Sequence, residues 1–151
     1  MLTNFVCQNN DETWFTFHEC RLRAISSNKT ILNLNGTFHQ TVTEFHVRGQ
    51  MFYKTNGYKP WLYNVQVECC RFMRKTYNPI AIIIYRFIKN YSNMNHTCPY
   101  KGAVIIKGLY LRFGALPNAL PTGDYMLALT WSLDNKTKFT TNAYFMFAED
   151  L

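Results

Sequence analysis

The sequence predicts an all-β fold, a sandwich of about seven antiparallel strands, on three observations. Aromatic residues make up 17% of the chain, chiefly 12 Phe and 10 Tyr, which favour pleated, half-buried surfaces. Polar and apolar residues alternate in one segment after another. The 151 residues, 48% of them hydrophobic, suit one core and exclude a disordered chain. We therefore expect a single domain over residues 1–151.

Seven segments carry the alternation or composition of strands. Turn sequences separate several of them, including Asn56-Gly57, and Asp134-Asn135-Lys136 predicts a tight hairpin between the last two. The predicted strands are residues 14–23, 30–38, 43–54, 61–70, 103–111, 125–133 and 137–148. Such spacing is typical of a β-sandwich.

The alternation also predicts which side chains share a face. In the fourth strand one face holds Trp61, Tyr63, Val65, Val67 and Cys69. In the last two strands, Tyr125, Leu127, Leu129, Trp131 and Leu133 are answered by Phe139, Ala143, Phe145 and Phe147. We expect these faces to form the core.

One helix is predicted, from Asn78-Pro79 to about Asn90, because asparagine suits the N-cap and proline the first helical position. Its residues are apolar almost all round, with only Arg86, Lys89 and Asn90 suited to water. We therefore expect the helix to be mostly covered.

Several features predict passage through the secretory route. The five N-x-S/T sequences begin at Asn28, Asn35, Asn90, Asn95 and Asn135, more than we expect by chance. The five cysteines lack the paired C-x-x-C spacing of a zinc site. Residues 1–4 lack the character of a signal peptide, so we expect the signal to lie outside this sequence. The longest apolar stretch, residues 80–85, is far short of the ~20 residues of a membrane span.

The formal charge of +7 would attract nucleic acid, anionic lipid head groups or acidic glycans. The basic residues are scattered, however, and the densest group is only Arg71, Arg74 and Lys75. A solvated face is the favoured interpretation, and no nucleic-acid partner is expected.

A series of short motifs relates the chain to a known family. They are Asn56-Gly57-Tyr58-Lys59-Pro60-Trp61-Leu62-Tyr63-Asn64, Cys70-Arg71-Phe72, Asn78-Pro79-Ile80-Ala81, Tyr91-Ser92-Asn93-Met94-Asn95-His96-Thr97-Cys98-Pro99-Tyr100, Pro121-Thr122-Gly123-Asp124-Tyr125 and Trp131. With them, most of the chain resembles the secreted fly proteins of unknown function that are related to the ML (lipid-recognition) superfamily and to the CheB chemosensory proteins. Cys69 departs from that pattern as an extra cysteine beside Cys70.

The resemblance implies an immunoglobulin-like sandwich whose two sheets can part to hold an acyl chain, a sterol or a similar ligand. The helix after Cys70 would then cover the cavity mouth. Candidate cavity residues are Val104, Ile106, Leu127, Leu129, Trp131, Phe139, Phe145 and Phe147 on strands, with Ile83 and Phe87 on the helix. Ordinary sandwich core is the alternative interpretation of the strand faces.

Two disulfide bonds are expected among the five cysteines. Cys7 with Cys20 would fasten the N-terminal segment, and Cys70 with Cys98 would close the excursion that carries the helix. Cys69 would remain a buried free thiol or pair with another molecule. Glycosylation is expected at Asn28, Asn35, Asn95 and Asn135.

No residue set predicts catalysis, a metal or a cofactor. His96 lies two residues from Cys98 without a third orienting group, and His18, His39 and His46 are spread over strands. Asp124 lies in a turn where it can bond its own backbone. We therefore expect a non-enzymatic extracellular protein.

The leading functional hypothesis is binding of a lipid or other hydrophobic small molecule, in chemosensation or immunity. The second is a protein-interaction module or accessory co-receptor with a solid core, acting on a membrane receptor. A nucleic-acid binder, the third, would show a steep dependence on salt.

Overall fold

The computed structural model describes residues 1–112 and 120–148 and contains eight strands and two α-helices in them. The elements are β1 (Leu2–Asn9), β2 (Phe15–Ser26), β3 (Lys29–Val42), β4 (His46–Thr55), β5 (Gly57–Glu68), α1 (Cys69–Arg74), α2 (Pro79–Ile88), a 3-10 turn η1 (Lys89–Tyr91), β6 (Tyr100–Leu109), β7 (Gly123–Leu133) and β8 (Lys136–Phe147). The predicted all-β class is confirmed, with β1 added to the seven expected strands.

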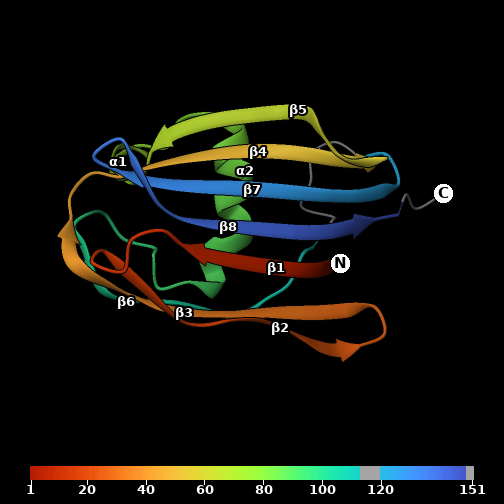
Figure 1. Cartoon of the computed structure of the whole chain (residues 1–151), viewed down its shortest axis with the longest axis horizontal. Coiled ribbons are helices and arrows are strands. Elements are labelled where there is room, and N and C mark those ends of the chain that lie inside the picture. Colours follow the sequence, from red (N-terminus) through yellow and green to blue (C-terminus); the bar gives the residue numbers. More distant parts are fainter. Residues whose placement is uncertain (113–119, 149–151) are drawn as a thin grey trace.

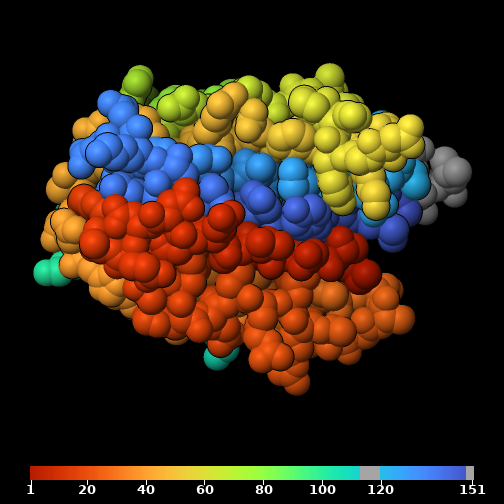
Figure 2. Space-filling model, in the orientation of Figure 1, coloured from red at the N-terminus to blue at the C-terminus, as the bar shows by residue number. Residues whose placement is uncertain are grey.

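The strands form two antiparallel sheets. The larger has the order β1-β8-β7-β4-β5 and the smaller the order β2-β3-β6. Figure 1 shows the five strands of the larger sheet side by side, with β2 and β3 below them and α2 behind. The space-filling view shows this strand face, on which α2 is hidden (Figure 2).

In the described ranges, strands of the two sheets pack against each other along one side. There β1 packs against β2, and the Cys7–Cys20 disulfide links the two strands. At the other side, β5 and β6 are the edges of different sheets, and α2 packs against both. The helix therefore bridges the open side of the sandwich.

The predicted hairpin joins β7 and β8. Asp134 and Asn135 have φ angles of 53° and 61°, and Leu133 pairs with Lys136. Two central residues with positive φ make the tight turn whose twist matches that of a hairpin. The register shifts by one residue between Ser132 and Trp131, and this irregularity produces the predicted same-face pairs, among them Trp131 with Phe139 and Tyr125 with Phe145.

The buried residues fall into two separate groups. The first core cluster contains Phe15, Phe38, Val42, Phe45, Cys69, Cys70, Tyr100, Leu133 and Phe139. The second contains Leu2, Leu32, Leu109, Leu120, Tyr125, Phe145 and Phe147. β3, β6, β7 and β8 each contribute to the first cluster near one end and to the second near the other, so the middle of the inter-sheet space is left to other residues.

The fourth strand was predicted to end at residue 70, but β5 ends two residues earlier, at Glu68. Cys69 and Cys70 lie in α1, a helix that the sequence analysis missed, rather than on opposite faces of a strand. Glu68 caps α1 with a carboxylate that accepts a hydrogen bond from the Arg71 amide at 3.0 Å. The strand alternation stops there because a side-chain oxygen satisfies a free amide of the first helical turn.

Both predicted disulfides are present. Cys7–Cys20 closes 13 residues, and Cys70–Cys98 closes 28 residues that include α2. Cys69 has no disulfide partner and is buried.

Replacing Cys70 and Cys98 together by alanine should lower the free energy of unfolding by about 3–4 kcal/mol, because the unfolded chain regains the entropy of the closed loop. Denaturant titration under oxidising conditions measures this. Cys69→Ala is the control, since it removes a buried sulfur but no cross-link, and its effect should be smaller. Equal losses in the two variants would contradict the prediction.

An ion pair fastens the β1–β2 connection to β8. The Lys138 ammonium lies 2.9 Å from the Asp11 carboxylate, which also accepts hydrogen bonds from the Thr13 amide and hydroxyl. The Thr13 and Lys138 hydrogen bonds lower the pKa of Asp11 to about 2. Lowering of the pKa means that the folded state favours the ionised form.

The stabilisation from Asp11 should be complete above pH 4 and should be lost as the pH falls from about 4 to about 2, because protonation then removes the favoured carboxylate. Thermal unfolding measured across this range should show the loss. Asp11→Asn should flatten this part of the profile. An unchanged acid slope in the variant would contradict the assignment to Asp11.

Candidate ligand-binding cavity

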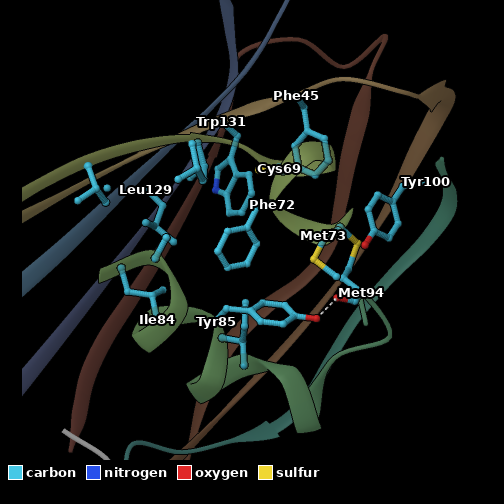
Figure 3. Close-up of a pocket in the computed structure, with 16 residues that line it drawn as sticks. Phe45, Cys69, Phe72, Met73, Ile84, Tyr85, Met94, Tyr100, Leu129 and Trp131 are labelled. Atoms are coloured by element: carbon cyan, nitrogen blue, oxygen red, sulfur yellow. Dashed lines mark hydrogen bonds between the residues drawn. The ribbon is translucent and has the colours of Figure 1, made fainter. Parts of the chain in front are cut away.

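An apolar cavity lies between the larger sheet and α2, and it has two adjoining lobes. The first lobe has a volume of about 120 Å³. Its lining residues are Phe45, Val47, Gly49, Val65, Val67, Cys69, Phe72, Met73, Ala81, Ile84, Tyr85, Ile88, Met94, Tyr100, Leu129 and Trp131. Figure 3 shows the rings of Phe45, Phe72 and Trp131 near one another above α2.

The second lobe has a volume of about 220 Å³. It is lined by Gly49, Met51, Tyr63, Val65, Ile80, Ile83, Ile84, Phe87, Ile88, Leu109, Leu111, Leu120, Leu127, Leu129 and Phe145. The lobes share Gly49, Val65, Ile84, Ile88 and Leu129, so they are neighbours along one continuous wall.

The helical floor of the cavity follows from local sequence. The Asn78 side chain accepts hydrogen bonds from the amides of Ile80 and Ala81, and Pro79 occupies the first turn. A side-chain cap and an N-terminal proline satisfy the start of a helix that has many β-branched residues. The helix predicted from residue 78 is thus confirmed, ending at Ile88 with η1 after it.

The expectation that α2 is mostly covered is confirmed, since only Pro79 and Arg86 among its residues are exposed. Its other side chains are partly buried, and none is fully buried. Two stripes of the helix face the cavity. The first lobe is bordered by Ala81, Ile84 and Ile88, and the second by Ile80, Ile83 and Phe87. A side chain that borders an empty cavity retains accessible surface, which explains the incomplete burial.

The polar groups around the first lobe are already hydrogen-bonded. The Tyr85 hydroxyl donates to the Met94 carbonyl at 3.2 Å, as Figure 3 shows, and the Tyr100 hydroxyl donates to the His96 carbonyl. The Trp131 indole N–H donates to the Thr141 hydroxyl at 3.1 Å. The lobe therefore presents a hydrocarbon, aromatic and sulfur surface to whatever occupies it.

The tyrosine hydroxyls at this lobe are kept neutral. Burial is the main cause that raises the pKa of Tyr85, and burial raises the pKa of Tyr100 to about 12. Burial, followed by the nearby Glu68 charge, also raises the pKa of the Cys69 thiol well above its usual range. A protonated, buried thiol is a poor nucleophile, so Cys69 contributes apolar surface.

The cavity contains part of the predicted candidate set. Leu129 and Trp131 border the first lobe, while Leu127, Leu129, Phe145, Ile83 and Phe87 border the second. The other four candidates do not border either lobe, and these are Val104, Ile106, Phe139 and Phe147.

Those four side chains serve the core at the ends of the sandwich. Phe139 stacks on Phe15 with ring centroids 4.6 Å apart in the first cluster, and Val104 packs against the same cluster. Phe147 is part of the second cluster, and Ile106 packs against it. The face was correctly assigned, but position along the strand decides between core and cavity.

The remaining lining residues were missed as site residues. Some of them lie on β4 and β5, where Val47, Val65 and Val67 follow the alternation seen in the sequence. On β5, the alternate residues Leu62, Asn64 and Gln66 are exposed, as the alternation predicts. The alternation could therefore have predicted the lining residues on the sheet. Cys69, Phe72 and Met73 could not be predicted in this way, because they line the cavity from α1, a helix that the alternation did not indicate.

The four predicted glycosylation sites, Asn28, Asn35, Asn95 and Asn135, are all exposed. Exposure is required for modification, and glycosylation itself stays a prediction. In residues 1–112 and 120–148, no cluster of three or more His, Cys, Asp or Glu side chains could hold a metal. No helix in the described ranges is both long and apolar enough to cross a bilayer.

Comparison with protein families gives one match. Residues 47–127, more than half of the chain, match the model of a family described as protein of unknown function (DUF1091). The chain belongs to this family. The DUF1091 match includes β5, both helices and β6 and most of β4, and therefore most of the cavity wall and the Cys70–Cys98 disulfide. No curated protein matches the chain.

Cys69 should react with a thiol reagent such as dithionitrobenzoate at least about tenfold faster in the unfolded chain than in the native protein, because burial and the raised pKa suppress its thiolate. Absorbance of the released thiolate measures both rates. Cys69→Ala should remove the reaction in both states. Rapid reaction of the native wild-type protein would contradict burial of this thiol.

Proposed function

We propose that this DUF1091 member binds a lipid or other hydrophobic small molecule between its two sheets, outside the cell. The two-lobed apolar cavity beside α2 is the observation that carries this proposal. The combined volume of the two lobes is near the lower end of the ~300–1,000 Å³ range that is typical of small-molecule sites. Such a site suits one modest apolar ligand.

The physical reason is that well-packed cores rarely leave such space. Residues around a void lose dispersion contacts that a filled core would provide. An apolar ligand would restore those contacts and remove apolar surface from water, which contributes roughly 25 cal/mol for each Å² buried. A protein-interaction module with a solid core, the alternative, would have no use for the space between the two core clusters.

Binding is favoured over catalysis in this proposal, because the polar groups bordering the first lobe are hydrogen-bonded to the protein itself. The two disulfides suit an oxidising compartment, which is consistent with secretion. An apolar ligand carried outside the cell suits chemosensation or immunity, with a membrane receptor as the second partner.

Native mass spectrometry of protein secreted from insect cells tests the proposal. A copurifying apolar molecule, released on denaturation, is the expected result. Displacement of an environment-sensitive apolar dye by fatty acids or sterols provides the second measurement. A ligand-free protein that neither takes up the dye nor binds any apolar competitor would overturn the proposal.

Two adjacent helix positions provide a matched pair of variants. Ile83 borders the second lobe, whereas Ile82 borders neither lobe. Ile83→Gln should weaken dye binding by about tenfold, because it places an amide without a partner in an apolar site. Ile82→Gln should bind as the wild type does. Equal losses in both variants would point to a general effect on α2 and would contradict the assigned site.

A further inference from the structure

The larger sheet has a second face, on the side away from the cavity. Leu127, Leu129 and Trp131 on β7 border the two lobes, so the residues that alternate with them point outward. The pairing of the strands extends this phase across the sheet. We define the outer face as the even-numbered residues of 4–8, 48–54, 58–66, 124–130 and 140–146. It is turned toward the viewer in Figure 1 and Figure 2.

The outer face exposes apolar side chains to water. Five large hydrophobic side chains are exposed in the described residues, and three of them, Val6, Leu62 and Met146, lie on the outer face. Leu62 is 72% exposed. Single exposed apolar residues are ordinary on a protein surface, whereas several on one face indicate an interaction site.

Aromatic rings join these side chains into a band. Phe52, Met126 and Tyr144 pair across β4, β7 and β8. Tyr58 on β5 is separated from Tyr144 on β8 by two strands, yet the centroids of their rings are 5.5 Å apart. The two rings therefore lie across the sheet. Tyr, Phe and Met are the residue types enriched at protein interfaces, and the band has all three.

Charge is sparse on the outer face, although the chain has a formal charge of +7. The charged residues among its positions are Arg48, Lys54 and Asp124. Lys54 and Asp124 adjoin the paired residues Tyr53 and Tyr125 on neighbouring strands, so their opposite charges are close together. The other polar side chains are amides and hydroxyls, which both donate and accept hydrogen bonds. Such groups can pair with their own kind, so the face is complementary to a copy of itself.

The outer face also lacks glycosylation sequences. Its asparagines are Asn4, Asn64 and Asn142, and none of them is followed by serine or threonine at the second position. The N-x-S/T sequences of the chain begin on the smaller sheet and its hairpin turn, in η1, in the segment before β6 and in the turn between β7 and β8. Glycans at those sites would leave the outer face accessible to a protein partner.

The outer face is large enough for a stable dimer. Five strands ~4.8 Å apart and about ten residues long, at ~3.3 Å per residue, cover roughly 800 Å². A specific protein interface buries about 800 Å² on each partner. Ala128 lies at the middle of β7, the central strand, so the centre of the face carries little bulk. Two sheets can then pack closely with their strands within about 30° of each other.

We propose that the protein forms a homodimer in which the outer faces of two copies pack against each other. This interface lies on the opposite side of the larger sheet from the cavity, so each copy keeps both lobes for a ligand. The dimer and the proposed ligand binding are therefore independent, and either can fail without the other.

The mass of the disulfide-bonded, glycosylated protein in solution tests the proposal directly. Size-exclusion chromatography with light scattering, together with sedimentation equilibrium at increasing concentration, should give twice the mass of one glycosylated chain. A monomer at every concentration would overturn the dimer.

Ala128 and Ala103 provide a matched pair of variants. Ala103 is exposed on β6 in the smaller sheet, away from the outer face. Ala128→Arg should weaken the dimer at least about tenfold, because it buries a bulky charge without a partner at the centre of the interface. Ala103→Arg should leave the dimer unchanged. Circular dichroism verifies that both variants fold. Equal dimer affinities in the two variants would place the interface elsewhere.

A glycan can serve as a wedge at the same face. Gln66→Thr creates a glycosylation sequence at Asn64, whereas Gln66→Ala changes the same exposed residue without creating one. Once intact mass spectrometry verifies the added glycan, Gln66→Thr should be monomeric, and Gln66→Ala should remain a dimer. Persistence of the dimer with a glycan on Asn64 would refute the outer face as the interface.

Discussion

The structure depends on an asymmetry between the two sides of the sandwich. At one side β1 packs against β2, and a disulfide links them. At the other side α2 packs against both β5 and β6, and its side chains line the space beside the larger sheet without filling it. The core therefore condenses into two aromatic-rich clusters at the ends of the strands, and the cavity is the part of the interior between them.

The fold was largely predictable, because an exposed outer face gives sheet strands a strict alternation. β5 is the clearest case, with Leu62, Asn64 and Gln66 exposed between inward Trp61, Tyr63, Val65 and Val67. The helix was predictable because Asn78 and Pro79 mark its start in the sequence. β1 was missed because its residues are mostly exposed or half-buried, so its place at a sheet edge follows from pairing with β8 rather than from any pattern of its own.

The candidate site was only partly predictable, because periodicity assigns a face but not a position along the sheet. Phe139 and Leu129 share a face, yet Phe139 stacks in a core cluster and Leu129 borders the cavity. Gly49 could not be recognised either, since a residue without a side chain adds nothing to a hydrophobic pattern. Its position on the wall shared by the two lobes follows only from how the strands and the helix pack. Tertiary structure alone supplies that information.

The Cys70–Cys98 disulfide also determines how the interior can be reached. It brings Cys70, before α2, to within 5.4 Å of Cys98, after α2, measured between Cα atoms, so the segment that carries the helix is a loop closed at its base. Such a loop can move only as a unit that stays attached to the sandwich. If the protein binds a ligand as proposed, exchange would depend on movement of this closed loop as a whole, which is slower than the motion of single side chains.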